Sequence, residues 1–172
     1  MTSHIRQPLT WLGIAAALLL ATAAPLSAKP EYNVIGAYAG PTTQTFFLRS
    51  DPPTLIIDLS VAGFANELGQ FTAVGEQTVN LLTGTYTGSY TFTTANGDTL
   101  TATTSGIRYP CLSSGVYCLE ENFTITGGTG EFSEATGSGT GRGVFSSLTN
   151  QIALVFAATV STTSTSGSIQ RE

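Results

Sequence analysis

Hydrophobic and polar residues alternate along most of this chain, and no stretch after residue 28 keeps a helical period. The clearest alternation covers residues 85–93, where Tyr86, Tyr90 and Phe92 share one face and threonine or serine fills the other. A period of two is typical of half-buried strands, because successive strand side chains point to opposite faces. Frequent Gly, Asn and Asp residues divide the pattern into about eight or nine strands, which predicts an all-β fold.

The same alternation predicts the remaining strands at 34–39, 43–50, 54–64, 71–82, 117–126, 135–145 and 150–161. Gly40-Pro41 separates the first two of these strands, and residues 108–119 form the longest irregular loop. In strand 54–64, Leu55, Ile57, Leu59 and Val61 share the apolar face, so Asp58 is expected on the outer surface. In strand 117–126, Phe123 and Ile125 are expected to point inward.

The turn Ala95-Asn96-Gly97 joins two of the strands in a hairpin. A loop of two residues would mix the polar and apolar faces, whereas a loop of three places Phe92 opposite Leu100. Burial decides strand register, so the longer loop is preferred. Gly97 then takes the left-handed position of a type I turn with a glycine bulge.

Glycine recurs at every second position in strand 135–145, at Gly137, Gly139, Gly141 and Gly143. Four glycines on one strand face leave bare backbone, which bulky groups must approach closely. In a small barrel, such a face permits sharp coiling and admits large side chains, and Tyr86, Tyr90 and Phe92 are the candidates to fill that space. A closed antiparallel barrel of about eight strands is therefore favoured, with a β-sandwich as the alternative.

Residues 1–28 read as a secretory signal peptide with cleavage near Ala28. The apolar run is short for a membrane span, although an uncleaved anchor is the alternative. The expected mature chain then comprises a barrel domain at 29–161 and a flexible tail at 162–172, rich in Ser, Thr and Gly. Export implies an oxidising compartment, so Cys111 and Cys118 are expected to form a disulfide rather than a metal or redox pair.

After removal of the leader, five basic residues face eleven acidic ones, a net charge of −6. Scattered bases on an acidic chain argue against nucleic acid as a partner, and no membrane span is expected after cleavage. The leader also removes the only histidine, His4. Histidine-based triads and histidine-ligated metals are thereby excluded. We expect no cofactor and no metal, and the oligomeric state is left open.

The segment Gly128-Thr129-Gly130-Glu131-Phe132, followed by Ala135 and Gly137, resembles the G-T-G-(K/R)-F-x-x-A-x-G segment of dirigent-like and allene oxide cyclase-like barrels. It is also similar to that of exported bacterial proteins of this type. Glu131 departs from the basic residue usual there. The resemblance implies an eight-stranded antiparallel barrel with an apolar cavity, in which the phenylalanine packs into one end.

The plant members of that group steer cyclisation or coupling of a bound intermediate, but the matched positions here are glycines and a core phenylalanine, so no functional residue carries over. Glu120 and Glu121 are adjacent in a strand and cannot both face one cavity. No catalytic residue is predicted. The expectation is an exported, non-catalytic binding or structural module that holds a small apolar molecule against Tyr86, Tyr90 and Phe92, or otherwise packs those rings as core. The alternative is a cofactor-free cyclase or isomerase that holds a reactive conformer.

Overall fold

The structure, a computed structural model, describes residues 30–111 and 113–162. The predicted leader and all but Thr162 of the predicted tail lie outside these residues. Eight strands and one short helix account for most of the described chain. They are β1 (Glu31–Phe47), β2 (Thr54–Ala65), β3 (Gly69–Asn80), β4 (Thr85–Thr94), β5 (Thr99–Pro110), β6 (Val116–Gly128), the 3-10 helix η1 (Gly130–Phe132), β7 (Thr136–Ser146) and β8 (Gln151–Ser161).

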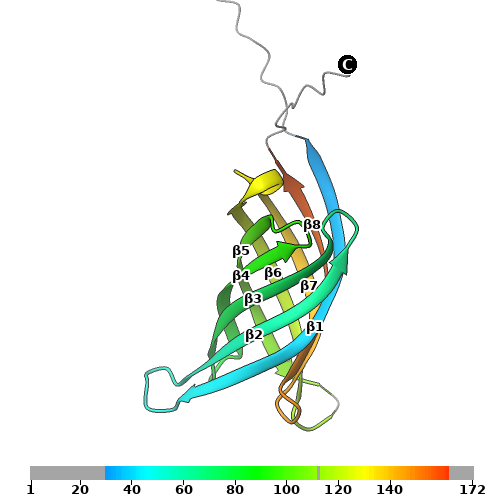
Figure 1. Ribbon diagram of the computed structural model, residues 1–172. Coiled ribbons are helices and arrows are strands. Elements are labelled where there is room, and N and C mark those ends of the chain that lie inside the picture. Colours follow the sequence, from blue (N-terminus) through cyan, green and yellow to red (C-terminus); the bar gives the residue numbers. More distant parts are fainter. Residues whose placement is uncertain (1–29, 112, 163–172) are drawn as a thin grey trace, which may run out of the picture.

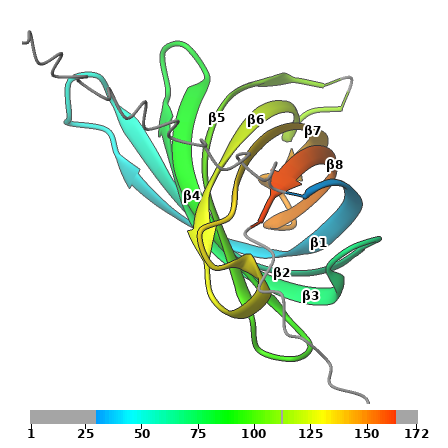
Figure 2. The same ribbon diagram turned by 90° about the horizontal axis from the view of Figure 1, so that it is seen from above.

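Each strand pairs antiparallel with the next, and β8 returns to pair with β1, so the sheet closes into a barrel. Figure 1 shows the barrel from the side, and Figure 2 shows the strands surrounding a common axis. The closing pair runs from Glu31 opposite Ser161 to Pro41 opposite Gln151. The prediction of a closed antiparallel barrel is therefore confirmed, and the sandwich alternative is wrong. None of the helical segments in the described ranges is long and apolar enough to cross a membrane.

Two sequence-based boundaries were wrong. β1 is one strand of 17 residues that runs through Gly40-Pro41. Pro41 is the last residue of β1 that pairs with β8. The pairing of β1 with β2 skips Gly40 and Pro41 and resumes at Thr42 in the same register, so the missing proline N–H interrupts that ladder only locally. Residues 108–119 are mostly strand, because β5 and β6 extend towards each other and leave only the segment between Pro110 and Val116 as a loop. Pairing of Arg108 with Leu119 continues the ladder into the expected loop.

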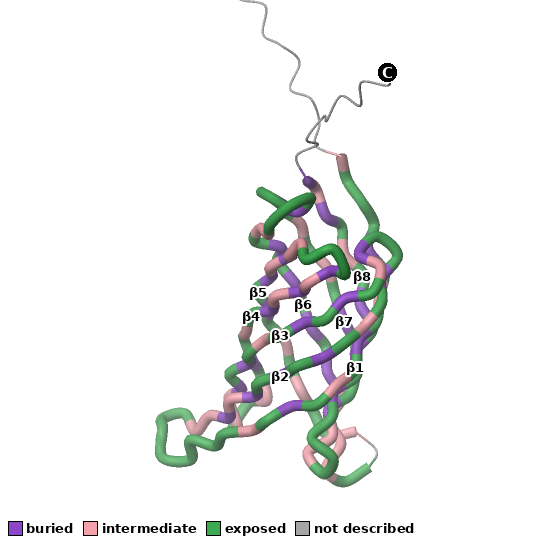
Figure 3. Tube along the Cα trace, viewed as in Figure 1, coloured by how far each residue is buried: buried purple, intermediate pink, exposed green. Residues whose placement is uncertain are grey.

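Inward and outward residues alternate along every strand, which Figure 3 shows as alternating buried and exposed positions. Leu55, Ile57, Leu59 and Val61 are buried as predicted, and Asp58 is exposed. Phe123 and Ile125 also lie in the core. Because the barrel has a single interior, these inward faces pack together in one hydrophobic core.

Inward glycines face aromatic rings across the strands of this core. Tyr86 pairs with Gly106, and Tyr90 pairs with Gly75. A Cβ built on Gly106 would lie 2.6 Å from the Tyr86 hydroxyl oxygen, and one on Gly75 would lie 2.8 Å from Cδ1 of Tyr90. Each ring therefore covers the bare backbone of the neighbouring strand, an arrangement that stabilises glycine in sheets.

The β7 glycines face inward as predicted, but Tyr86, Tyr90 and Phe92 do not fill the space beside them. A Cβ on Gly141 would meet Leu154 and Phe123, and one on Gly139 would meet Ala158. The neighbours on β6 and β8 fill this space because cross-strand pairing brings them closest. The tyrosines instead cover glycines on the strands next to their own.

The predicted turn and disulfide are confirmed. Phe92 pairs with Leu100, and Gly97 has a φ of 92°. Cys111 and Cys118 form a disulfide that bridges the β5–β6 loop. Phe132 of η1 is buried at the end of the barrel where β1 begins and β8 ends, as the family resemblance implied. Gly128 and Gly130 flank this turn, and Gly130 has a φ of 59° with the Asp98 carboxylate against its α-carbon.

Candidate functional site

A cluster of polar side chains lies inside the barrel, and Glu121 of β6 is at its centre. Its Oε1 accepts hydrogen bonds from Gln77 Nε2 of β3 at 3.0 Å, from the Tyr90 hydroxyl of β4 at 3.0 Å and from Thr104 Oγ1 of β5 at 2.6 Å. The Tyr38 hydroxyl of β1 donates to that of Tyr90 at 3.1 Å. Five strands thus contribute to one network around a carboxyl group.

The second carboxyl oxygen of Glu121, Oε2, is buried and has no hydrogen-bond partner within the described part of the chain. The whole side chain is only 2% exposed. A buried polar atom without a partner costs free energy, and such an atom calls for an explanation. Because Oε1 already accepts three hydrogen bonds, the proton of the neutral Glu121 carboxyl group resides on Oε2.

Burial raises the pKa of Glu121 to about 7, although the hydrogen bonds from Thr104, Tyr90 and Gln77 oppose this shift. Desolvation outweighs these bonds because the side chain is almost completely buried. Burial, followed by the charge of Glu121, also raises the pKa of Tyr38. The tyrosines therefore remain protonated donors, and the carboxyl group changes charge near neutral pH.

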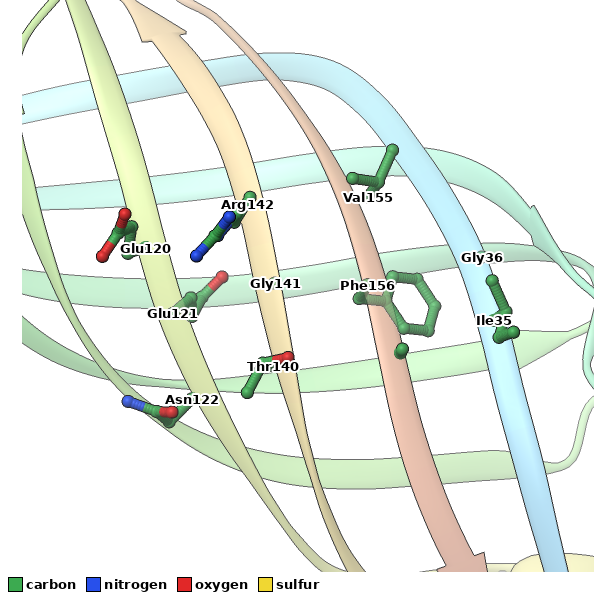
Figure 4. Close-up of a pocket in the computed structure, with 11 residues that line it drawn as sticks. Ile35, Gly36, Glu120, Glu121, Asn122, Thr140, Gly141, Arg142, Val155 and Phe156 are labelled. Carbon is green, nitrogen blue, oxygen red and sulfur yellow. The ribbon is translucent and has the colours of Figure 1, made fainter.

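Glycines flank Glu121 on both sides. One cross-strand row runs around the barrel through Gly106 (β5), Glu121 (β6), Gly141 (β7), Phe156 (β8) and Gly36 (β1). No side chain stands between Glu121 and Phe156 in this cross-strand row, because Gly141 separates them. Figure 4 shows the Glu121 carboxyl end turned towards Gly141.

The Phe156 ring is central to an aromatic cluster. Its centroid lies 6.1 to 6.3 Å from those of Tyr38, Phe71, Phe92 and Phe123. Beside this cluster is an apolar cavity of about 20 Å³, lined by residues that include Val34, Leu68 and Phe156. Such a volume holds about one water molecule, and its apolar lining favours a dry void. Side chains thus fill the part of the interior that the resemblance would make a ligand cavity.

A larger hollow of about 670 Å³ lies on the outer wall over β6, β7, β8 and β1. Glu120, Asn122, Thr140 and Arg142 line its polar side on β6 and β7, whereas Val155 and Ile35 line its apolar side (Figure 4). Ala157, Glu121 and Phe156 also belong to its lining. Glu120 and Glu121 lie on opposite faces of β6, as predicted. The Glu120 carboxylate accepts a hydrogen bond from the Tyr109 hydroxyl at 3.3 Å.

Of the predicted ligand-contacting residues, Tyr90 belongs to the polar cluster, and Phe92 packs against Tyr90 with centroids 5.8 Å apart. Tyr86 lies over Gly106, and its hydroxyl is 3.5 Å from the Glu120 carbonyl oxygen. Sequence reasoning missed Glu121 and Gln77. Alternation could have found both, because Glu121 shares a face with Phe123 and Gln77 shares one with Phe71. Across the described residues, no three His, Cys, Asp or Glu side chains gather where they could hold a metal.

The fold of this protein, a closed antiparallel barrel of eight strands, is a dirigent-like barrel. Solved structures that resemble it include two pterocarpan synthase dirigent proteins, PsPTS1 and GePTS1. PsPTS1 superimposes with a TM-score of 0.59 and 12% identity over 80% of this chain and 98% of its own. GePTS1 superimposes with a TM-score of 0.57 and 12% sequence identity, over 89% of this chain and 99% of its own. No family model matches the sequence, and no curated protein matches it.

Proposed function

We propose that this protein is an exported barrel that binds a small, mainly apolar molecule carrying one hydroxyl group, with that hydroxyl at Glu121. The proposal rests on Oε2 of Glu121, which is buried and has no hydrogen-bond partner among the residues that the structure describes. A hydroxyl can donate to the carboxylate or accept from the neutral acid, so it satisfies Oε2 on either side of the pKa of about 7. The leader-like residues 1–28 and the Cys111–Cys118 disulfide support export.

The ligand body takes the place of the Phe156 ring. This ring neighbours Gly141 and Gly36 on the two adjoining strands, and it is the most exposed large side chain of the core at 8%. Displacing it opens the small apolar cavity towards Gly141, and the side chains of Leu154 and Phe123 beside Gly141 must also rotate before the ligand reaches Glu121. Tyr90 and Phe92 then contact the ligand, in keeping with the sequence-based prediction, while Tyr86 remains over Gly106.

The test compares phenol with toluene, which differ mainly by a hydroxyl group. In F156A, the space of the ring is available in advance, as in engineered apolar cavities that bind benzene. Calorimetric titration should show phenol binding at least about fivefold more tightly than toluene, and this preference should vanish in F156A/E121Q. Wild-type protein should bind phenol more weakly, because the ring must first move.

Equal binding of phenol and toluene by F156A would refute the proposal, as would a preference that survives in F156A/E121Q. If F156A fails to fold, F156L removes less volume and serves the same comparison with small phenols. Native mass spectrometry of protein purified from its own host provides an independent check, because the proposal expects a bound molecule with a hydroxyl group.

A second function, a cofactor-free isomerase or cyclase, is favoured by one observation. Glu121 changes protonation near neutral pH and lies in an apolar interior, which suits a group that accepts and returns a proton. A β,γ-unsaturated ketone is a suitable probe, because moving one proton from the α-carbon to the γ-carbon yields the conjugated isomer without a co-reactant. F156A should accelerate this conversion as pH rises through about 7, and F156A/E121Q should not. Equal rates in the two variants would exclude this function for Glu121.

A further inference from the structure

The outer wall of the barrel carries a second hollow, whose lining includes Tyr38 of the interior cluster but not Glu121. Two cross-strand rows form it on β7, β8, β1 and β2. The first row consists of Val144, Ala153, Ala39 and Ala62. The second row contributes Arg142, Val155 and Ala37. The hollow is shallow and widely open to solvent, and its volume is about 480 Å³, within the usual range of small-molecule sites. We call it the wall hollow.

Arg142 is the single charged side chain that lines the wall hollow. Throughout the described residues, it takes part in no ion pair or hydrogen bond. Its cross-strand neighbour Glu120 accepts a hydrogen bond from the Tyr109 hydroxyl and forms no ion pair with Arg142. The other described cations differ, since Arg108 is stacked over the Tyr117 ring at 4.7 Å and Arg49 lies in the β1–β2 connection.

The remainder of the wall hollow is apolar and open. Val155 is 61% exposed and Val144 is 45% exposed. Burial of such surface stabilises a bound apolar body, and the guanidinium fork can donate two hydrogen bonds to the oxygens of an anionic head. The larger hollow shares Arg142 but places Glu120 beside it, which disfavours an anion there. The wall hollow combines one cation with apolar surface, and no carboxylate lines it. This combination fits a small molecule with an anionic head and an apolar body.

We propose that the wall hollow binds a small amphiphilic anion, with its carboxylate, sulfonate or phosphate head on Arg142 and its apolar body over Ala153 and Ala39. The ligand is a free small molecule rather than a lipid in a membrane. Recognition of an anionic membrane surface takes clusters of four to eight Lys or Arg, and the wall hollow offers one cation.

Two fluorescent probes test the charge and the apolar body separately. Anilinonaphthalene sulfonate carries the anionic head, and phenylnaphthylamine is its neutral counterpart. The sulfonate should bind wild-type protein saturably, and R142Q should weaken it about fivefold to tenfold while leaving the neutral probe unchanged. R49Q is the matched charge control and should bind both probes as wild type does.

Ala153→Leu and Ala157→Leu distinguish a shaped site from general surface hydrophobicity. Both alanines are exposed on the outer face of β8, but only Ala153 lines the wall hollow. A153L should abolish binding of both probes because it fills the hollow, and A157L should leave it unchanged. Stronger binding by A153L would overturn the proposal, since it would indicate non-specific attraction to apolar surface.

The proposal is also overturned if wild-type protein shows no saturable sulfonate binding, or if R142Q and R49Q weaken it equally. Phosphatidylserine vesicles should show no binding that depends on Arg142, and such binding would assign the site to a membrane instead. Thermal melts verify that each variant folds, and R142K replaces R142Q if necessary, with an intermediate loss expected because lysine keeps only the charge. These outcomes are independent of Glu121, so failure here leaves the interior proposal intact.

Discussion

The hydroxyl group of Tyr90 lies 3.0 Å from Oε1 of Glu121 and donates a hydrogen bond to it. Tyr90 in turn accepts hydrogen bonds from Tyr38 at 3.1 Å and from Gln77 Nε2 at 2.7 Å. This series of hydrogen bonds crosses the barrel interior from β1 to β6. It fixes the carboxyl group by Oε1 alone and leaves Oε2 for another partner, which is the property that the proposed ligand site uses.

Glu121 should make the stability of the barrel depend on pH. Burial raises its pKa from 4.5 to about 7 in the folded state, so the folded state binds more protons than the unfolded state between these values. The free energy of unfolding therefore falls as pH rises through this window, by about 3 kcal/mol for this group. Below about pH 4.5 this group has no such effect, and above about 7 the loss is complete.

The measurement is urea unfolding of wild type and E121Q at about pH 5 and about pH 8. Glutamine keeps the acceptor for Tyr90, Gln77 and Thr104 but does not titrate. The stability of wild type relative to E121Q should decrease by about 3 kcal/mol between these conditions. A constant difference would show that the carboxyl group keeps an ordinary pKa and is hydrated in the folded protein.

Alternation in the sequence predicted most of the strands and the hairpin register, because one face of each strand must be buried. It wrongly divided β1 at Gly40-Pro41, and the barrel was predicted from the glycine face of residues 135–145 instead. The same parity places Glu121 with Phe123 inside, but the general rule that carboxylates lie on the surface obscured it. The meeting of Glu121 with Gln77 could not be predicted. These residues lie on β6 and β3, and their contact depends on how the strands are staggered when the barrel closes.

The disulfide should contribute substantially to stability although it closes a short loop. Cys111 and Cys118 are seven residues apart, and the chain-entropy model gives about 2 to 3 kcal/mol for a loop of this length. The double variant C111S/C118S should lose this amount in chemical unfolding. Alkylation of the native protein without reductant should label neither cysteine, and labelling of both would show that the bridge does not form.

The three-residue turn depends on a glycine with left-handed backbone geometry. Gly97 has a φ of 92°, and nothing lies within 4 Å of a Cβ added there, so a substitution is strained by its backbone alone. Gly97→Val should lower stability by about 1 to 3 kcal/mol because a β-branched residue disfavours positive φ. Gly97→Asn should cost less, since asparagine tolerates this region. Equal melting temperatures for the two variants would contradict this explanation.

The two glycines beside Glu121 should respond differently to alanine. A Cβ on Gly106 would lie 2.3 Å from the Glu120 carbonyl oxygen, which the sheet holds in place, whereas one on Gly141 would meet only the side chains of Leu154 and Phe123, at 2.7 and 2.9 Å. G106A should therefore cost about 1 to 3 kcal/mol through overpacking, and G141A should cost less, because its neighbours can rotate.

G141A should nevertheless weaken phenol binding in the F156A background, since its methyl group enters the space between Glu121 and the ring position. Urea unfolding and calorimetry measure these two effects. If G141A proves as costly as G106A, the space beside Gly141 is rigidly filled, and no ligand reaches Glu121 by that route.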